Sequence, residues 1–250
     1  HFSFARELDL LDSKGRETWR ITFGAGRAFL NLWNDQAPPT AFLLHQLLSY
    51  DRTFLIPFLI RLVETDYNFA TGKFVGLESQ VKKVWQEMWD VHWRDLQARE
   101  PPLPKPSEVK PRTMLHHAMA RIRFLNRMEG LRLGIDRLNH LTKLFQGCED
   151  SDEMPGDSFF KIGNALSGHR PTEMNSSELT DRVLQGFSSL QRAGYASAYG
   201  IYCLINERSL PQKAVDWQGF VGHVRKNPPF SARASIRRDD FLITVDRITE

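Results

Sequence analysis

Apolar residues recur at helical spacing through much of this chain. Val81, Trp85, Trp89 and Trp93 lie four residues apart, and lysines and a glutamate occupy the positions between them. This spacing places the apolar side chains on one face of an α-helix, and that face must be buried against another surface. The pattern predicts that helices dominate the fold.

Strand-like alternation is confined to short stretches. One lies at residues 17–23, and in another Phe241, Ile243 and Val245 alternate with their neighbours. The proportions of hydrophobic residues (41%) and charged residues (25%) are ordinary for a globular protein, and 250 residues can bury a core. We therefore expect a mainly α fold with small β-hairpins.

Five prolines interrupt the helical patterns in the segment 97–112. Proline fixes φ and lacks a backbone N–H, so neither a helix nor a strand ladder can continue through this segment. We expect a linker here, between a first region, 1–96, and a second region, 113–250. The segment 147–158 is rich in acidic residues and is expected to form a surface loop.

The most apolar stretch of the chain, residues 41–63, is too interrupted to cross a membrane. Charged residues such as Asp51 and Arg52 leave fewer than the roughly 18 consecutive apolar residues that a spanning helix needs. We expect two buried helices instead. Cys148 and Cys203 form no CxxC motif, so neither a disulfide framework nor a zinc site is indicated, and we expect a cytoplasmic protein.

The opening residues carry a family resemblance. A helix end with the letters LDLL (8–11) is followed by a turn at Gly15, a short strand, and a helix start that contains Thr22, Gly26 and Leu30. This order resembles the second half of a winged helix-turn-helix domain, with a two-stranded hairpin, the wing, after the recognition helix. Weaker likeness occurs in two later segments, 121–145 and 183–247.

The resemblance implies winged-helix modules, combined with a helical bundle, that bind double-stranded DNA. It implies a non-catalytic DNA-binding subunit of a prokaryotic regulatory or phage-defence system. The chain starts at His1, close to this unit, so we expect a piece of a longer polypeptide whose preceding residues would read bases. A structural or dimerisation role for the unit is the alternative.

Cations gather in two segments, although the net charge of +3 is small for the length. One is the segment 101–145. The other, 223–238, contains no acid, and its prolines Pro228 and Pro229 predict a loop that presents the cations. Either segment is alternatively an ordinary solvated surface. The residues predicted to contact nucleic acid are Lys14, Arg16, Arg121, Arg123, Arg127, Arg225, Lys226, Arg233, Arg237 and Arg238.

Motifs for catalysis are not found in the sequence. The chain has neither a GxxxxGK[ST] nor a GxGxxG loop, and the adjacent His116 and His117 cannot share a metal on a helix. We therefore expect no cofactor, no metal and no catalytic residue. A metal-dependent nuclease is an alternative, and Asp239, Asp240 and Asp246 are its candidate carboxylates.

A protein-interaction scaffold is the competing hypothesis. In that reading Trp85, Trp89 and Trp93 bury against a partner or a second copy of the chain, together with the segment 41–63. Tryptophans at helical spacing are more often core or interface residues than base-stacking platforms. A scaffold would keep its partner when the cations are reversed, whereas a DNA-binding protein would lose its duplex.

Overall fold

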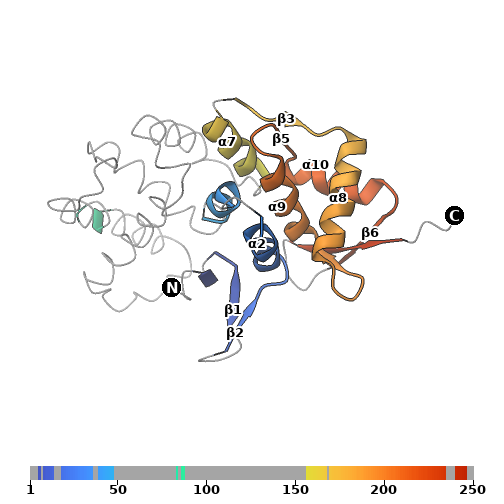
Figure 1. Ribbon diagram of the computed structural model, residues 1–250, viewed down its shortest axis with the longest axis horizontal. Coiled ribbons are helices and arrows are strands. Elements are labelled where there is room, and N and C mark those ends of the chain that lie inside the picture. Colours follow the sequence, from blue (N-terminus) through green and yellow to red (C-terminus); the bar gives the residue numbers. More distant parts are fainter. Residues whose placement is uncertain are drawn as a thin grey trace, which may run out of the picture. The chain divides into compact units, whose positions relative to one another are not determined.

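The structure is a computed structural model of the chain (Figure 1). It divides into two compact units, residues 1–50 with 152–250, and residues 51–151. These limits are not those of the division expected from the sequence, and the predicted linker, 97–112, lies outside the described residues. The structure describes residues 5–6, 8–13, 18–35, 39–47, 83, 86–87, 156–167, 169–234 and 240–246.

The first unit is mainly helical with small sheets, which confirms the expected fold class at this level. Residues 40–47 are helical in addition to the named elements. The named elements are β1 (Leu11–Ser13), β2 (Trp19–Ile21), α2 (Ala25–Trp33), α7 (Gly156–Ser167), β3 (Thr172–Glu173), α8 (Ser176–Leu190), β4 (Ala196–Ser197), α9 (Ala198–Ser209), β5 (Lys213–Ala214), α10 (Trp217–Lys226), β6 (Phe230–Ala234) and β7 (Phe241–Val245).

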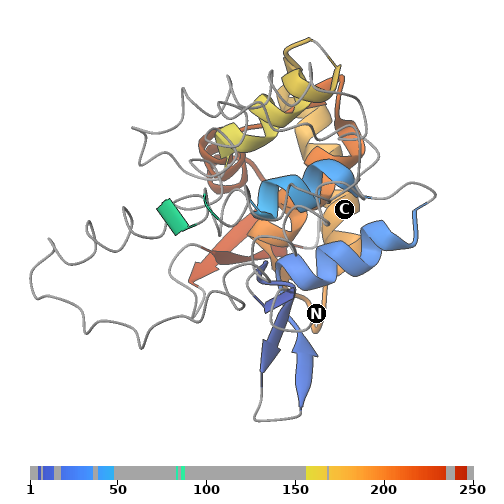
Figure 2. The ribbon, with the colours of Figure 1, turned by 90° about the vertical axis from the view of Figure 1, so that its left-hand side faces the viewer.

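The hairpin and helix predicted near the start of the chain are present. β1 and β2 pair antiparallel, with Leu11 opposite Ile21, and the hairpin projects from the other described elements of its unit (Figure 2). Thr22 fixes the entry to α2, because its hydroxyl accepts a hydrogen bond from the Gly26 N–H at 2.7 Å and donates one to the Asp9 carbonyl at 2.6 Å. Residues 22–26 therefore join the hairpin rigidly to α2.

Three helices of the C-terminal part begin at side-chain caps. Asn175 accepts a hydrogen bond from the Glu178 N–H at 2.9 Å, Ser197 accepts one from the Gly200 N–H at 3.0 Å, and Asp216 accepts one from the Gly219 N–H. Each bond satisfies one of the orphan donors of a first helical turn. These caps define where α8, α9 and α10 start.

Two sheets stand beside these helices. β7 lies between β4 and β6 in an antiparallel sheet of order β4-β7-β6, in which Ile243 pairs with both Ala196 and Ala232. β3 and β5 form a parallel two-stranded sheet. Phe241 and Ile243 are buried, so one face of the larger sheet packs against the helices.

Helix α9 is the centre of the core. Its residues from Ala198 to Asn206 are all buried, and α2 and α8 both pack against it (Figure 1). Close packing explains why glycine occupies two contact positions, one where α8 meets α9 and one where α9 meets the residue before α2. A Cβ at Gly186 of α8 would lie 2.9 Å from Ile201, and one at Gly200 would lie 3.0 Å from the Gly24 carbonyl oxygen. A helix that is covered on all sides presents no polar face to solvent, as found for residues 198–206 of α9.

A polar cluster is buried between residues 40–47, α7 and α9. The His45 ring shares a hydrogen bond with the Tyr199 hydroxyl at 3.0 Å and stacks on Phe159 with ring centroids 4.1 Å apart. The Gln46 amide donates to the same hydroxyl at 3.2 Å. Nδ1 of His45 and Oε1 of Gln46 have no partner among the described residues. Burial lowers the pKa of His45 to about 3, so the imidazole is neutral at pH 7.

Glu207 of α9 caps the helical segment 40–47. Its carboxylate accepts a hydrogen bond from the Phe42 N–H, and the Ala41 N–H is a second backbone donor. Burial raises the pKa of Glu207 to about 7, although both backbone bonds act in the opposite direction. The carboxyl group therefore titrates close to neutral pH.

Two local expectations can be compared with the structure. Within 41–63, the described residues 41–47 are helical and Phe42, Leu44 and Leu47 are buried, as predicted, and the remainder lies outside the described residues. The prediction of a loop over 147–158 is wrong for its last residues, because α7 begins at Gly156. None of the described helices combines the length and the apolar character needed to cross a membrane.

Candidate nucleic-acid interface

Helix α10 has an inner face and an outer face. Trp217, Phe220 and Val224 are buried, at the i, i+3, i+7 spacing of an amphipathic helix. The Trp217 ring packs edge-on against Tyr202 of α9, with centroids 5.1 Å apart. Exposed positions on the helix include Gln218, Gly219, Arg225 and Lys226, and no residue of α10 is acidic. The outer face therefore carries cations and small or amide-bearing residues.

His223 belongs to the packing of α10 rather than to its outer face. The ring is 8% exposed, and its Nε2 shares a hydrogen bond with the Thr180 hydroxyl of α8 at 2.9 Å. Asn227 caps the helix by donating from its amide to the His223 carbonyl at 2.9 Å. Burial lowers the pKa of His223, so at neutral pH it adds no charge to the basic segment.

Arg233 and Arg225 each lie over an aromatic ring. The Arg233 guanidinium of β6 donates to the Tyr195 hydroxyl at 3.1 Å, and its carbon is 5.6 Å from the centre of that ring. The Arg225 guanidinium lies 5.5 Å from the centre of the Phe241 ring in β7. Such contacts hold a guanidinium in place while its charge stays exposed.

The structure brings three of the ten predicted nucleic-acid contacts into one C-terminal module. Arg225 and Lys226 end α10, Arg233 lies on β6, and all three are exposed. No described carboxylate forms an ion pair with them. The other seven lie outside the described residues: Lys14, Arg16, Arg121, Arg123, Arg127, Arg237 and Arg238.

The expectation that 223–238 is one presenting loop is wrong for its described residues. α10 continues to Lys226, and β6 begins at Phe230, so the prolines Pro228 and Pro229 lie in a short turn. The apolar face of α10 and the pairing of β6 with β7 decide this, because both bury side chains that a loop would expose. The cations are consequently carried by a helix end and a strand.

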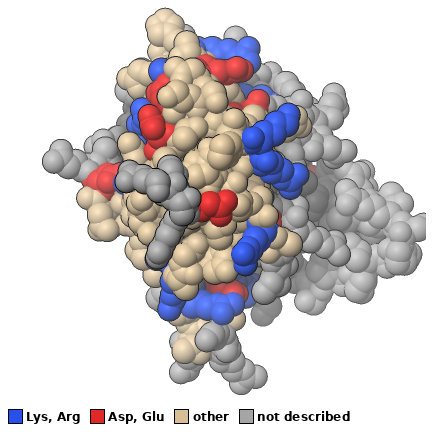
Figure 3. All heavy atoms as spheres, turned by 90° about the vertical axis from the view of Figure 1, so that its right-hand side faces the viewer, with Lys and Arg blue, Asp and Glu red and all other residues tan. Residues whose placement is uncertain are grey.

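On the face of the molecule drawn in Figure 3, the described Lys and Arg residues do not form one continuous patch. Figure 3 shows them at several separate places with Asp and Glu between them. Ion pairs are also present among the described residues, since Glu178 pairs with both Lys213 and Arg182. The exposed cations of α10 and β6 are therefore local groups and not part of one broad basic field.

The described carboxylates near β7 are structural rather than catalytic in their contacts. Asp240 accepts hydrogen bonds from the Ser197 hydroxyl at 2.6 Å and the Tyr199 N–H at 3.0 Å, whereas Asp246 accepts from the Ser231 hydroxyl at 2.8 Å. They lie at opposite ends of a five-residue strand, too far apart to share a metal ion. Within the described ranges, no group of three His, Cys, Asp or Glu side chains is placed to hold a metal.

Two residues of this module were not found by sequence reasoning. Tyr195 carries no charge and belongs to no motif found in the sequence. Nothing in the sequence therefore connects it to Arg233, 38 positions later. Gln218 is one polar residue in an amphipathic helix, and only the burial of its neighbours shows that it points outward. A helical wheel over 217–226 would have given the signal for Gln218.

Comparison with known proteins adds no relative. No family model matches the chain, and no curated protein or solved structure matches it either. Function is therefore inferred from the residues of this chain.

Proposed function

We propose that the chain binds double-stranded DNA through α10 and the β6–β7 hairpin. One observation carries the proposal, the order α8, β4, α9, β5, α10, β6, β7 with sheet order β4-β7-β6. A helix, a short strand, two helices joined by a connection that contains β5, and a terminal hairpin resemble a complete winged helix-turn-helix domain. In that arrangement α10 is the helix that enters the major groove and β6–β7 is the wing.

The composition of α10 supports this role. Gln218 is exposed in the first turn, where a recognition helix meets base edges, and glutamine can pair with the N6 and N7 atoms of adenine. A Cβ at Gly222 would have no heavy atom within 4 Å, so this side of the helix offers little steric barrier to a groove. Arg225 and Lys226 follow at the end of the helix, where phosphates can be reached.

The opening hairpin supports the proposal less directly. β1, β2 and α2 are a hairpin followed by a helix, which resembles the second half of such a domain, and Thr22 and Gly26 join them. Lys14 and Arg16, the cations expected at its tip, lie outside the described residues. A role in a prokaryotic regulatory or defence system follows from the family resemblance alone.

The test is a salt titration of binding to three ligands of the same mixed sequence pool: duplex DNA of about 30 base pairs, or three helical turns, single-stranded DNA and RNA. We expect the duplex to bind best, with affinity falling steeply with salt. Arg225→Ala with Lys226→Ala should weaken duplex binding and reduce the log–log salt slope by about 2, or roughly 0.9 per lost phosphate contact.

Arg20→Ala is the matched control, because Arg20 is also exposed but is paired with Asp12 at 2.6 Å on the β1–β2 hairpin. It should leave the slope nearly unchanged. Salt-independent binding, or a double variant that binds like the parent, would contradict the proposal.

A protein-interaction surface is the second candidate function, and a specific observation favours it. Among the described residues, the exposed large hydrophobic side chains are Ile21, Phe23, Leu30 and Trp33, and Trp33 is 62% exposed. All four belong to β2, α2 or the turn between them, and Leu30 and Trp33 lie one turn apart on α2, where neighbouring exposed apolar side chains are typical of a docking surface.

The structure describes only part of the surface that the sequence suggested for a scaffold. Its segment 41–63 is already buried within the first unit at the described positions 41, 42 and 44–47, so these residues cannot also cover a partner. Trp85, Trp89 and Trp93 lie outside the described residues. Leu30→Ser with Trp33→Ser should abolish protein association and leave duplex affinity unchanged, whereas Arg225→Ala with Lys226→Ala should do the reverse.

A further inference from the structure

In the turn between α8 and β4, Arg192 and Tyr195 lie directly opposite each other and pair through their backbones. The Arg192 N–H donates to the Tyr195 carbonyl at 2.7 Å, and the Tyr195 N–H donates back to the Arg192 carbonyl at 3.1 Å. The two central residues have positive φ values, 52° at Ala193 and 80° at Gly194, which is the geometry of a tight two-residue turn. Residues directly opposite in such a pair place their side chains on the same face.

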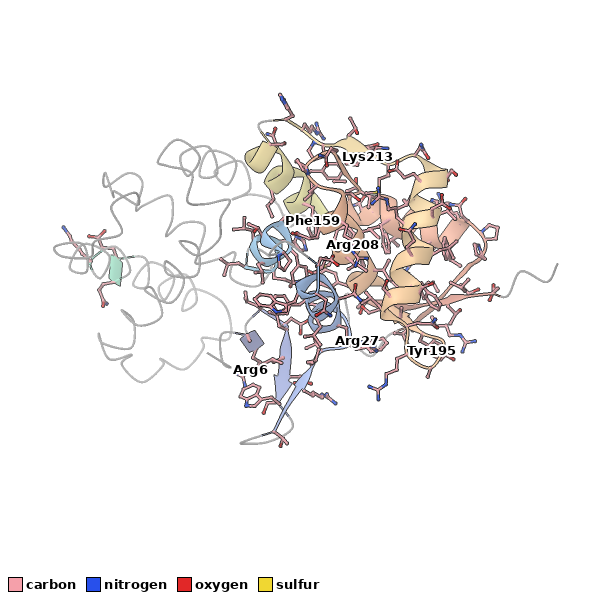
Figure 4. The ribbon with its side chains drawn as sticks, in the orientation of Figure 1. Arg6, Arg27, Phe159, Tyr195, Arg208 and Lys213 are labelled. Carbon is pink, nitrogen blue, oxygen red and sulfur yellow. The ribbon has the colours of Figure 1, made fainter. Side chains whose placement is uncertain are left out.

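Tyr195, which is labelled in Figure 4, also contacts Arg233 across the sheet. Tyr195 immediately precedes β4, Arg233 lies on β6, and β7 runs between the two strands. The tyrosine holds the guanidinium in two ways, by its hydroxyl at 3.1 Å and by its ring at 5.6 Å. One hydrogen bond uses one of the five N–H donors of an arginine, and the described residues bring no carboxylate to the others.

The register fixes the face on which this contact lies. Phe241 and Ile243 are buried against the helices, and they pair with Ala234 and Ala232. Arg233 pairs with Leu242, so it alternates to the other face of the sheet, which is turned away from α10. The cation of Arg233 is therefore presented on a different side of the hairpin from the outer residues of α10.

We propose that Tyr195 is a positioning residue that holds Arg233 for contact with a DNA phosphate outside the groove entered by α10, with Arg192 as a second cation on the same turn. The inference rests on the proposed function. A guanidinium that is already oriented loses less side-chain freedom when it binds, and arginine and tyrosine are common phosphate donors. A duplex contacted in this way must extend past the segment that α10 covers.

The experiment is a double-mutant cycle read in two duplex lengths. On a duplex of about 30 base pairs, Arg233→Ala and Tyr195→Ala should each weaken binding by about threefold to tenfold, as expected for one lost charge-assisted contact. Tyr195→Phe keeps the ring and should give a smaller loss. In the Arg233→Ala background, Tyr195→Ala should have no further effect, because Tyr195 acts through Arg233.

The effect of duplex length on binding distinguishes a DNA contact from a purely structural role. A structural role would weaken binding to both lengths equally. On a duplex of about 12 base pairs, little more than one helical turn, the Tyr195 and Arg233 variants should bind like the parent, and Arg225→Ala should still bind more weakly. Arg192→Ala should lower the salt slope by about 0.9 on the long duplex only.

Additive effects of Tyr195→Ala and Arg233→Ala, or equal losses on both duplexes, would overturn the inference. If the parent binds duplex DNA with the expected salt dependence and these variants bind with the affinity of the parent, this inference alone fails. If the parent shows no salt-dependent duplex binding, the proposed function fails with it. Thermal unfolding of each variant separates loss of contact from loss of fold.

Discussion

Asp240 accepts a hydrogen bond from the Ser197 hydroxyl at 2.6 Å, and Ser197 in turn caps α9 by accepting from the Gly200 N–H at 3.0 Å. The same carboxylate accepts from the Tyr199 N–H at 3.0 Å. A single aspartate at the start of β7 thus fixes the first turn of the central helix, and the residue offered by the sequence as a nuclease carboxylate is occupied by structural donors.

Asp240→Ala should destabilise the protein by about 2 kcal/mol, because it leaves cap donors of a buried helix start without an acceptor. Urea denaturation measures the loss. Asp246→Ala is the matched control at the other end of β7. Its side chain is exposed, so its loss should stay within about 0.5 kcal/mol. Equal losses would contradict the capping role.

Gly26→Ala should destabilise the protein by about 2 to 3 kcal/mol, the usual range for overpacking. A Cβ at this position would overlap the Leu10 carbonyl oxygen and lie 2.7 Å from the Thr22 hydroxyl oxygen, so the hairpin and α2 would have to separate. Gly222→Ala is the control, because a Cβ there meets nothing within 4 Å and α10 should gain up to about 1 kcal/mol in helix propensity. Chemical denaturation should show a lower free energy of unfolding for Gly26→Ala and an unchanged or higher one for Gly222→Ala.

Glu207→Gln should remove a pH dependence of stability near neutral pH. The folded pKa of about 7 lies above the unfolded value of 4.5, so the folded protein keeps a proton that the unfolded chain releases. The resulting stability is present at pH 5 and is lost as the pH rises through 7. The parent should therefore lose about 2 kcal/mol relative to the variant between pH 5 and pH 8.

Unfolding free energies of the parent and Glu207→Gln, measured at each pH, test this. Glu173→Gln removes an exposed carboxylate on β3 and serves as the comparison. A constant difference between the parent and Glu207→Gln across the range would show that the buried carboxyl does not titrate there.

His45→Gln should remove a pH dependence of the opposite sign. The folded pKa of about 3 lies below the unfolded value of 6.5, so the unfolded chain takes up a proton that the folded protein excludes. Stability from this group is complete above about pH 7 and is lost as the pH falls from 6.5 towards 3. The parent should lose about 2 kcal/mol relative to the variant between pH 8 and pH 5.

Glutamine keeps a polar group for the Tyr199 hydroxyl, so the variant should still fold, and the measurement is again unfolding free energy against pH. Parallel curves for parent and variant would mean that the imidazole is accessible to protons in the folded state.

Local pattern was sufficient for much of the fold. The strand at Trp19–Ile21, the helix that starts near Gly26 and the strand at Phe241–Val245 were predicted from alternation and helical spacing, and all three are confirmed. Each element has its own periodicity, and the period follows from backbone geometry alone. Arg225, Lys226 and Arg233 were likewise found as cations without the structure, and their contact with DNA stays a prediction.

The remaining features needed tertiary structure, because they join residues distant in sequence. The sequence by itself determined which residues are charged and, for the three elements named above, whether the segment is helical or extended. Only the fold decided that α9 is covered by α2 and α8, that Asp240 bonds to Ser197, the cap of α9, 43 positions earlier, and that Arg233 contacts Tyr195. Periodicity reports one element at a time, whereas burial and hydrogen-bond partners depend on which elements pack together.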